Sequence, residues 1–165
     1  MEQIKIKLNG GMMPKKATPF DAAYDVYVPE DTDIKIGRQR IDLKFSAELP
    51  HGTAALMRAR SGYSLEGVEA YAIRLDSDKE EKVRIDADVI TGLCDEKYRG
   101  NYGVLLNVHF LAPLWAPFYY RRVYLKKGTR IAQMQIVAVP DTEIVAVAEL
   151  DMTNDRGGGF GHTNK

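Results

Sequence analysis

The sequence predicts an all-β fold, either a sandwich or a barrel. Many short stretches alternate apolar and polar residues, as residues 3–8 do, and this period of two is typical of half-buried strands. Glycine or proline interrupts almost every stretch, and no long amphipathic helix is evident. The chain has 165 residues, 45% of them hydrophobic, which is enough for one domain with a real core.

The first half is expected to contain strands and one short helix. A strand over residues 3–8 leads to a turn at 9–11 and a polar loop at 13–19. A segment of small residues, 20–28, then ends at Pro29. Further strands are expected at 33–36, 41–49 and 53–58, separated by Gly37 and Pro50-His51-Gly52. The short helix is expected near residues 63–69.

The second half continues the same pattern. Strands at 71–75 and 82–86 flank an acidic, turn-rich tip at 76–81, which lacks the glycine and glutamate spacing of a calcium loop. Strands follow at 102–110, 121–125, 131–137 and 143–150, with an apolar connection around Trp115. We expect a domain over residues 1–150 and a flexible Gly-rich tail over 151–165.

Charge and composition argue against several classes of partner. Lys+Arg and Asp+Glu both number 23, so the net charge is zero and no nucleic-acid partner is expected. No apolar run approaches the ~20 residues that span a bilayer, so no membrane partner is expected. The one cysteine, Cys94, permits neither an intrachain disulfide nor a multi-cysteine zinc site. These features favour a cytoplasmic protein.

The stretch of residues 92–100 concentrates reactive groups. Two glycines bracket Asp95, Tyr98 and Arg99, immediately before the apolar run at 102–110. The charged cluster should therefore lie at the mouth of a buried strand, where the backbone can approach a ligand. The alternative is an ordinary aspartate-containing turn between strands.

Three other segments carry possible chemistry. Arg60-Ser61-Gly62 suits a turn into a helix that holds a phosphate, and the alternative is that Ser61 is an ordinary cap of a short helix. Asp25 lies among apolar neighbours, and the alternative is a strand-edge carboxylate in water. The glycine-rich tail carries Arg156 and Phe160, which suit a phosphate and a base, although such tails are often idle.

Five segments, in this order, resemble the five sequence motifs of the trimeric dUTP diphosphatase (dUTPase) family. They are Ala-Tyr-Asp-Val-Tyr (23–27), Arg-Ser-Gly (60–62), Gly-Leu-Cys-Asp-Glu-Lys-Tyr-Arg-Gly (92–100), Gly-Thr-Arg-Ile-Ala-Gln (128–133) and Arg-Gly-Gly-Gly-Phe-Gly-His-Thr (156–163). The resemblance covers the chain from about residue 20 to its end. It implies a jelly-roll subunit in a homotrimer that hydrolyses dUTP to dUMP and diphosphate at sites between subunits.

The resemblance also implies roles for individual residues. Asp95 would activate the attacking water, and Tyr98 would pack under the deoxyribose and exclude a 2′-hydroxyl. Asp25, the second catalytic residue, would act through waters on a Mg²⁺ ion that the substrate phosphates hold, so no residue would bind the metal directly. The implied substrate-binding residues are Arg60, Ser61, Gly62, Val89, Thr91, Gly92, Tyr98, Gln133, Arg156, Phe160 and Gly161.

Within that set, the resemblance assigns residues to different parts of the nucleotide. Ser61, with Arg60 and Gln133, would hold the phosphates. Backbone groups at about residues 89–92 would recognise uracil. Arg156 would pair with the γ-phosphate, and Phe160 would cover the uracil ring as the tail closes.

Some residues depart from the family pattern. Ala59 stands where proline is usual, Thr129 where aspartate is common, and His162 where a small hydroxyl residue is usual. Two alternatives remain: a dCTP deaminase of the same fold, and a jelly-roll binding protein without catalysis. Magnesium-dependent diphosphate release would indicate a dUTPase, and ammonia release would indicate a deaminase. Neither product is expected from a binding protein.

Overall fold

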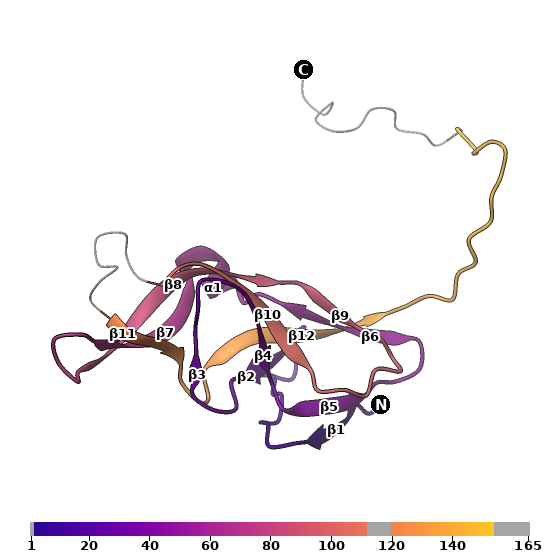
Figure 1. The fold of residues 1–165 in the computed structure, drawn as a ribbon. Coiled ribbons are helices and arrows are strands. Elements are labelled where there is room, and N and C mark those ends of the chain that lie inside the picture. Colours follow the sequence, from indigo (N-terminus) through magenta and orange to yellow (C-terminus); the bar gives the residue numbers. More distant parts are fainter. Residues whose placement is uncertain (1, 112–119, 154–165) are drawn as a thin grey trace.

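The computed structural model describes residues 2–111 and 120–153, and in these residues the fold is all-β with one short helix (Figure 1). This confirms the expected fold class. The elements are β1 (Lys5–Leu8), β2 (Tyr24–Tyr27), β3 (Thr32–Asp33), β4 (Gly37–Asp42), β5 (Phe45–Glu48), β6 (Thr53–Arg58), α1 (Ser61–Glu66), β7 (Val68–Arg74), β8 (Glu80–Ile90), β9 (Gly92–Cys94), β10 (Gly103–Phe110), β11 (Tyr120–Leu125) and β12 (Arg130–Ala138).

The strands form three antiparallel sheets. A six-stranded sheet has the order β3-β11-β7-β8-β10-β4, a four-stranded sheet has the order β2-β12-β6-β9, and β1 pairs with β5. The consecutive strands β8 and β9 belong to different sheets, so the chain passes from one sheet to the other at Thr91. The residues expected to recognise uracil therefore lie at this crossing.

Apolar side chains from both large sheets form one core. Val26, Met57, Ile131 and Met134 contribute from the four-stranded sheet, and Ile41, Ile85, Val104, Leu106 and Leu125 from the six-stranded sheet. Tyr102, just before β10, is fully buried and its ring lies 5.3 Å from that of Phe45. This packing fixes the end of the loop that carries Asp95 and Tyr98.

Several expected boundaries were wrong. Gly37 begins β4 rather than separating two strands, and the single strand expected at 41–49 is two, β4 and β5. They are interrupted next to Lys44, which has a positive φ of 51°. The helix lies at Ser61–Glu66, earlier than expected, because Gly67 ends it with a φ of 82°.

The hairpin around 76–81 is longer than the sequence indicated. β7 starts at Val68 and β8 extends to Ile90, so the two strands pair over six registered positions from Val68–Ile85 to Ile73–Glu80. At the tip, Arg74 forms an ion pair of 2.7 Å with Asp76 and holds the pKa of that carboxyl at about 2. The Trp115 connection lies outside the described residues.

The strand expected at 143–150 does not form. Residues 139–153 leave β12 as an extended segment that runs away from the sheets (Figure 1). Ile144 is 99% exposed, and Val145, Val147 and Leu150 are also exposed. The pattern in this segment suits a strand, but no strand of the described chain pairs with it. The boundary between domain and tail at residue 150 stays a prediction.

Candidate active site

Asp25 is a buried carboxylate surrounded by polar partners. It lies on β2, with 7% of its surface exposed, and its backbone bonds with Lys15 on one side. Its Oδ1 accepts a hydrogen bond from Gln133 Nε2 at 3.3 Å and lies 3.3 Å from Arg60 Nε. Its Oδ2 lies 3.4 Å from Arg130 Nη1. Asp25 does lie on an edge strand of the sheet, but the alternative in which its carboxylate is in water is wrong.

β12 brings Gln133 to Asp25 across 108 sequence positions. Gln133 is registered with Asp25 on one side and with Arg58 on the other. Gln135, two positions along, accepts a hydrogen bond from Arg58 Nη1 at 3.2 Å. The alternation in residues 131–137 therefore predicted correctly which face carries the polar side chains.

Arg60 and Ser61 lie where β6 gives way to α1. Arg60 is the cap residue of the helix, in an extended conformation and without a side-chain cap hydrogen bond. Its guanidinium lies 5.5 Å from the ring centroid of Tyr63, the buried residue of the helix. Ser61 and Gly62 are exposed, and Ser61 is the first helical residue, so the alternative of Ser61 as an ordinary cap is wrong.

Arg130 is a member of this cluster that the sequence reasoning did not single out. It begins β12 directly after the turn at Gly128-Thr129, opposite Tyr27 of β2. Its position in the fourth motif was visible in the sequence, but its ion pair with Asp25 depends on the β2–β12 register. Together with Arg60 it gives this edge of the sheet two guanidinium groups, which suits a polyanion.

A second group of expected residues lines a cavity of about 230 Å³. The cavity lies where β9 leads into the loop before β10. Its lining residues are Arg40, Met57, Gly92, Leu93, Cys94, Asp95, Tyr98, Asn101, Tyr102, Gly103 and Leu105. Asp95 is exposed, and the Tyr98 side chain is exposed and tilted 34° against the Tyr102 ring, 5.9 Å away. A carboxylate and an aromatic ring of the 92–100 stretch thus line one cavity, just before the strand β10, which has buried residues.

The loop is held in shape by its own hydrogen bonds. The Tyr98 N–H donates to Asp95 O at 3.0 Å, which closes a turn. Arg99 Nη1 donates to Glu96 O at 2.6 Å and to Tyr98 O at 3.2 Å. In the described chain, the hydrogen bonds of Arg99 are therefore to its own loop backbone.

Glu96 ties this loop to the turn before β6. Its Oε2 accepts a hydrogen bond from the Gly52 N–H at 2.9 Å and lies 3.1 Å from His51 Nδ1. The Gly52 N–H and then His51 lower the pKa of Glu96 below its ordinary value of 4.5. This contact joins segments 44 positions apart and was not visible in the sequence.

The residues expected at uracil lie on the crossing between sheets. Val89 is registered with Leu106 of β10, and Gly92 with Met57 of β6. Thr91 lies between them and is exposed. Next to them, burial and then Asp95 raise the pKa of the Cys94 thiol above 9.0, which keeps it protonated at neutral pH.

The two groups lie at opposite edges of the four-stranded sheet. β2, with Asp25, is one edge strand, and β9, which leads to Asp95, is the other. Three strand spacings of ~4.8 Å separate these edges by about 14 Å. No hydrogen bond or ion pair between described residues joins Asp25 and its partners to the Asp95 loop. One chain therefore has two separate groups of candidate residues, Asp25 with its partners and the residues around the Asp95 cavity, which we call the two half-sites.

The donor set at Asp25 does not make a protein-bound metal site. One carboxylate lies between two guanidinium groups, and these repel a cation. Among residues 2–111 and 120–153, no three side chains of His, Cys, Asp or Glu gather in a way that could hold a metal. The set fits a Mg²⁺ ion that arrives on phosphate oxygens and meets Asp25 through water. Arg156, Phe160, Gly161 and His162 lie outside the described residues.

Comparisons with known proteins identify the family of this chain. The dUTPase family model matches residues 10–88. The deoxyuridine 5′-triphosphate nucleotidohydrolase of rabbitpox virus is 30% identical over 156 residues, covering 94% of this chain and 87% of that protein. The chain belongs to the dUTPase family. The enzyme of the same name from Clostridium tetani is 29% identical over 164 residues, covering 99% of this chain and 96% of that protein.

Solved dUTPase structures share the fold. The dUTPase of Staphylococcus bacteriophage 80alpha, determined with dUpNHpp, has a TM-score of 0.76 at 23% identity and covers 100% of both chains. The dUTPase of phage phi11 of S. aureus, described with a structural Mg(II) ion, has a TM-score of 0.68 at 19% identity, covering 90% of this chain and 98% of that one. Family membership thus rests on the sequence relatives, and the solved structures support the fold.

Two departures from the family pattern can be located. Ala59 is half-buried between β6 and α1, so the helix starts without the usual proline. Thr129 is buried, and its carbonyl accepts a hydrogen bond from the Val28 N–H at 2.9 Å. A buried carboxylate at this position would cost more free energy than the neutral threonine hydroxyl unless it found a charged or hydrogen-bonding partner.

Proposed function

We propose that this chain hydrolyses dUTP to dUMP and diphosphate. The observation that carries the proposal is the cavity where Asp95 and Tyr98 meet, in a chain of the dUTPase family. In the proposal, the exposed Asp95 carboxylate accepts a proton from the attacking water. The resulting hydroxide adds to the α-phosphorus, and the bond from that phosphorus to the bridging oxygen breaks, which releases diphosphate.

The other residues bind and neutralise the substrate. In the proposal, Tyr98 supports the deoxyribose, and backbone groups of Val89, Thr91 and Gly92 recognise uracil. At the other half-site, Arg60, Ser61, Gly62, Gln133 and Arg130 hold phosphate oxygens. Phosphoryl transfer depends mostly on such positioning and charge neutralisation. Mg²⁺ on the phosphates supplies further positive charge, with Asp25 acting on its waters.

The proposal includes the tail and the cellular setting. Arg156, Phe160 and Gly161 would cover the bound nucleotide, so removal of residues 155–165 should nearly eliminate activity. No helix of the described chain is long and apolar enough to cross a membrane. A cytoplasmic location, and the absence of nucleic-acid and membrane partners, stay predictions.

A homotrimer, the assembly known for this family, would complete the site. Each chain keeps Asp25 and Asp95 on opposite edges of a sheet, so a half-site of one subunit can meet the other half-site of a neighbour. The exposed apolar residues of 139–153, such as Ile144 at 99% exposure, also favour burial against another subunit.

Substrate assays test the activity directly. Diphosphate release would be measured with dUTP, dCTP, dTTP and UTP, each with magnesium and with a chelator. Release from dUTP alone, lost with the chelator, is expected. Ammonia release from dCTP would indicate a deaminase instead, and no product from any nucleotide would favour a binding protein.

Mixed oligomers test the shared site. Asp25→Asn and Asp95→Asn should each be inactive. If each site takes Asp25 from one subunit and Asp95 from another, random trimers of the two variants should regain about a quarter of wild-type activity, because each half is intact with a chance of about one in two. If both residues come from the same chain, coexpressed variants should stay inactive.

A further inference from the structure

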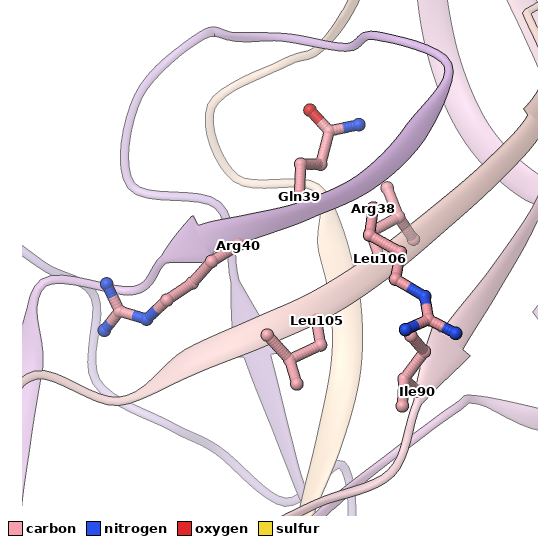
Figure 2. A pocket seen from close by; sticks show the side chains of 6 residues that line it. All are labelled: Arg38, Gln39, Arg40, Ile90, Leu105 and Leu106. Carbon is pink, nitrogen blue, oxygen red and sulfur yellow. The ribbon is translucent and has the colours of Figure 1, made fainter.

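Arg40 lies beside the Asp95–Tyr98 cavity although no family-like segment includes it. It occupies β4, an edge strand, in register with Leu105 of β10. Figure 2 shows its guanidinium pointing away from that of Arg38, with Leu105 between the two groups. Arg38 and Arg40 both line a neighbouring cavity of about 410 Å³, but Arg40 alone of the two also lines the cavity with Asp95.

The loop after Tyr98 holds the Arg40 side chain. Arg40 Nη2 donates to the backbone oxygen of Asn101 at 2.7 Å, and Nη1 lies 3.7 Å from the Asp42 carboxylate. Gly103 leaves space for this arrangement, because a Cβ there would lie only 2.6 Å from Arg40 Nε. The guanidinium therefore contacts the backbone of the loop, although the side chain stays 47% exposed.

The Asn101 carbonyl oxygen has a second donor. The Tyr98 hydroxyl donates to the same oxygen at 3.1 Å. A carbonyl oxygen has two lone pairs, so one acceptor can serve Arg40 and Tyr98 together. The Asn101 side chain is fixed as well, since its Oδ1 accepts from Asn9 Nδ2 at 2.8 Å.

This shared acceptor matters because Tyr98 is only partly packed. The residue is 43% exposed, and one side of its ring faces Tyr102. A hydrogen bond from a charged donor is about twice as strong as a neutral one. Arg40 is therefore the stronger of the two donors that hold the Asn101 carbonyl, and the position of the Tyr98 hydroxyl follows that carbonyl.

We propose that Arg40 is a positioning residue for Tyr98 and thereby sharpens discrimination between deoxyribonucleotides and ribonucleotides. This inference rests on the proposed function, in which Tyr98 leaves no space for a 2′-hydroxyl. A steric wall rejects an added hydroxyl only if the wall cannot move aside. By fixing the Asn101 carbonyl, Arg40 limits the movement of the Tyr98 ring.

The full-length Arg40→Ala variant tests the inference, with Arg38→Ala as its control. The control also removes an arginine side chain from the same face of β4. Unlike Arg40, Arg38 does not bond to the Asn101 carbonyl that Tyr98 uses. The ratio of kcat/KM for dUTP to that for UTP should fall about tenfold in Arg40→Ala, the range of one charge-assisted hydrogen bond. It should change less than about twofold in Arg38→Ala, and Arg40→Lys should recover part of the ratio.

A double variant tests the shared carbonyl. Tyr98→Phe removes the hydroxyl donor and should also lower the ratio. If both residues act through Asn101, the effects of Arg40→Ala and Tyr98→Phe should be clearly less than additive in the double variant. Additive effects would overturn the link.

Amide hydrogen exchange provides a readout independent of turnover. Residues 98–103 should exchange faster in Arg40→Ala than in Arg38→Ala. Unchanged exchange would overturn the positioning role, and faster exchange with an unchanged dUTP/UTP ratio would overturn the role in specificity. If the wild type does not hydrolyse dUTP, the proposed function fails by itself, and exchange alone then decides whether Arg40 positions this loop.

Discussion

Substitution of Gly67 by alanine should destabilise the fold from a position outside the half-sites. Gly67 follows α1 with φ 82° and ψ 171°, a conformation that is essentially restricted to glycine. A Cβ there would lie 2.5 Å from the backbone oxygen of Ile85. That oxygen belongs to β8, which pairs with β7 through the register of Val68 and Ile85, so it cannot move aside like the end of a side chain.

The expected cost is about 3 kcal/mol or more, because backbone strain of about 1–3 kcal/mol adds to the steric overlap. For a chain of this size, each kcal/mol corresponds to about 2–4 °C in the midpoint of thermal unfolding. Gly67→Ala should therefore lower the midpoint by about 6–12 °C.

Gly62→Ala is the matched control within the same helix. Nothing lies within 4 Å of a Cβ at Gly62. Alanine in a helix is more favourable than glycine by about 0.5–1 kcal/mol, so this variant should unfold at a slightly higher temperature. Its kcat/KM for dUTP should nevertheless fall, because the added methyl lies at the proposed phosphate site.

Thermal unfolding by circular dichroism measures both variants. The protein concentration must be the same in all samples, because the stability of an oligomer depends on it. A midpoint for Gly67→Ala within about 2 °C of the wild type would refute the argument. It would show that the backbone of β8 at Ile85 can shift to make room for the Cβ at little cost. A lower midpoint for Gly62→Ala would refute the assignment of that position as open helix.

Three further predictions concern single side chains. Asp95→Asn should abolish diphosphate release and leave the oligomer intact by size-exclusion chromatography, and near-normal turnover would remove Asp95 from its role. The pKa of Glu96 is lowered from 4.5, so its contribution to stability is present above that pH and is lost as the pH falls through the folded pKa. Unfolding midpoints should thus decline less toward acid pH in Glu96→Gln, and parallel declines would contradict this. The pKa of His109 is raised above 6.5 by Asp88, 2.9 Å away, so its contribution is present below 6.5 and is lost as the pH rises through the folded pKa. Asp88→Asn should return the NMR titration midpoint of His109 toward 6.5, and an unmoved midpoint would disprove the pair.

Local sequence patterns were sufficient to predict the fold class and to indicate the candidate residues. Alternation with period two, as in residues 131–137, and turns at glycine or proline depend on neighbours in sequence, so they indicated strands without knowledge of the partners. The order of the five motif-like segments along the chain indicated the family, again without knowledge of which residues are in contact. Element boundaries were predicted wrongly at two glycines with positive φ. Gly37 begins β4 instead of separating two strands, and Gly67 ends the helix earlier than expected.

The segment at 143–150 shows the limit of such patterns. Its apolar residues have the composition of a strand, yet a strand exists only when another strand supplies hydrogen-bond partners. Within the described chain, β2 and β9 are the edges of the four-stranded sheet, and neither pairs with this segment. Within the described part of one chain, the strand-like pattern of residues 143–150 therefore does not produce a strand.

The sequence by itself determined the all-β class and the family, and it proposed the residues for the chemistry. The tertiary structure decided which of them meet. Gln133 reaches Asp25 across 108 positions, Glu96 reaches Gly52 across 44, and Arg40 reaches Asn101 across 61. The physical reason is that hydrogen bonds and ion pairs act over a few ångströms in space, whereas sequence patterns report only on neighbours along the chain.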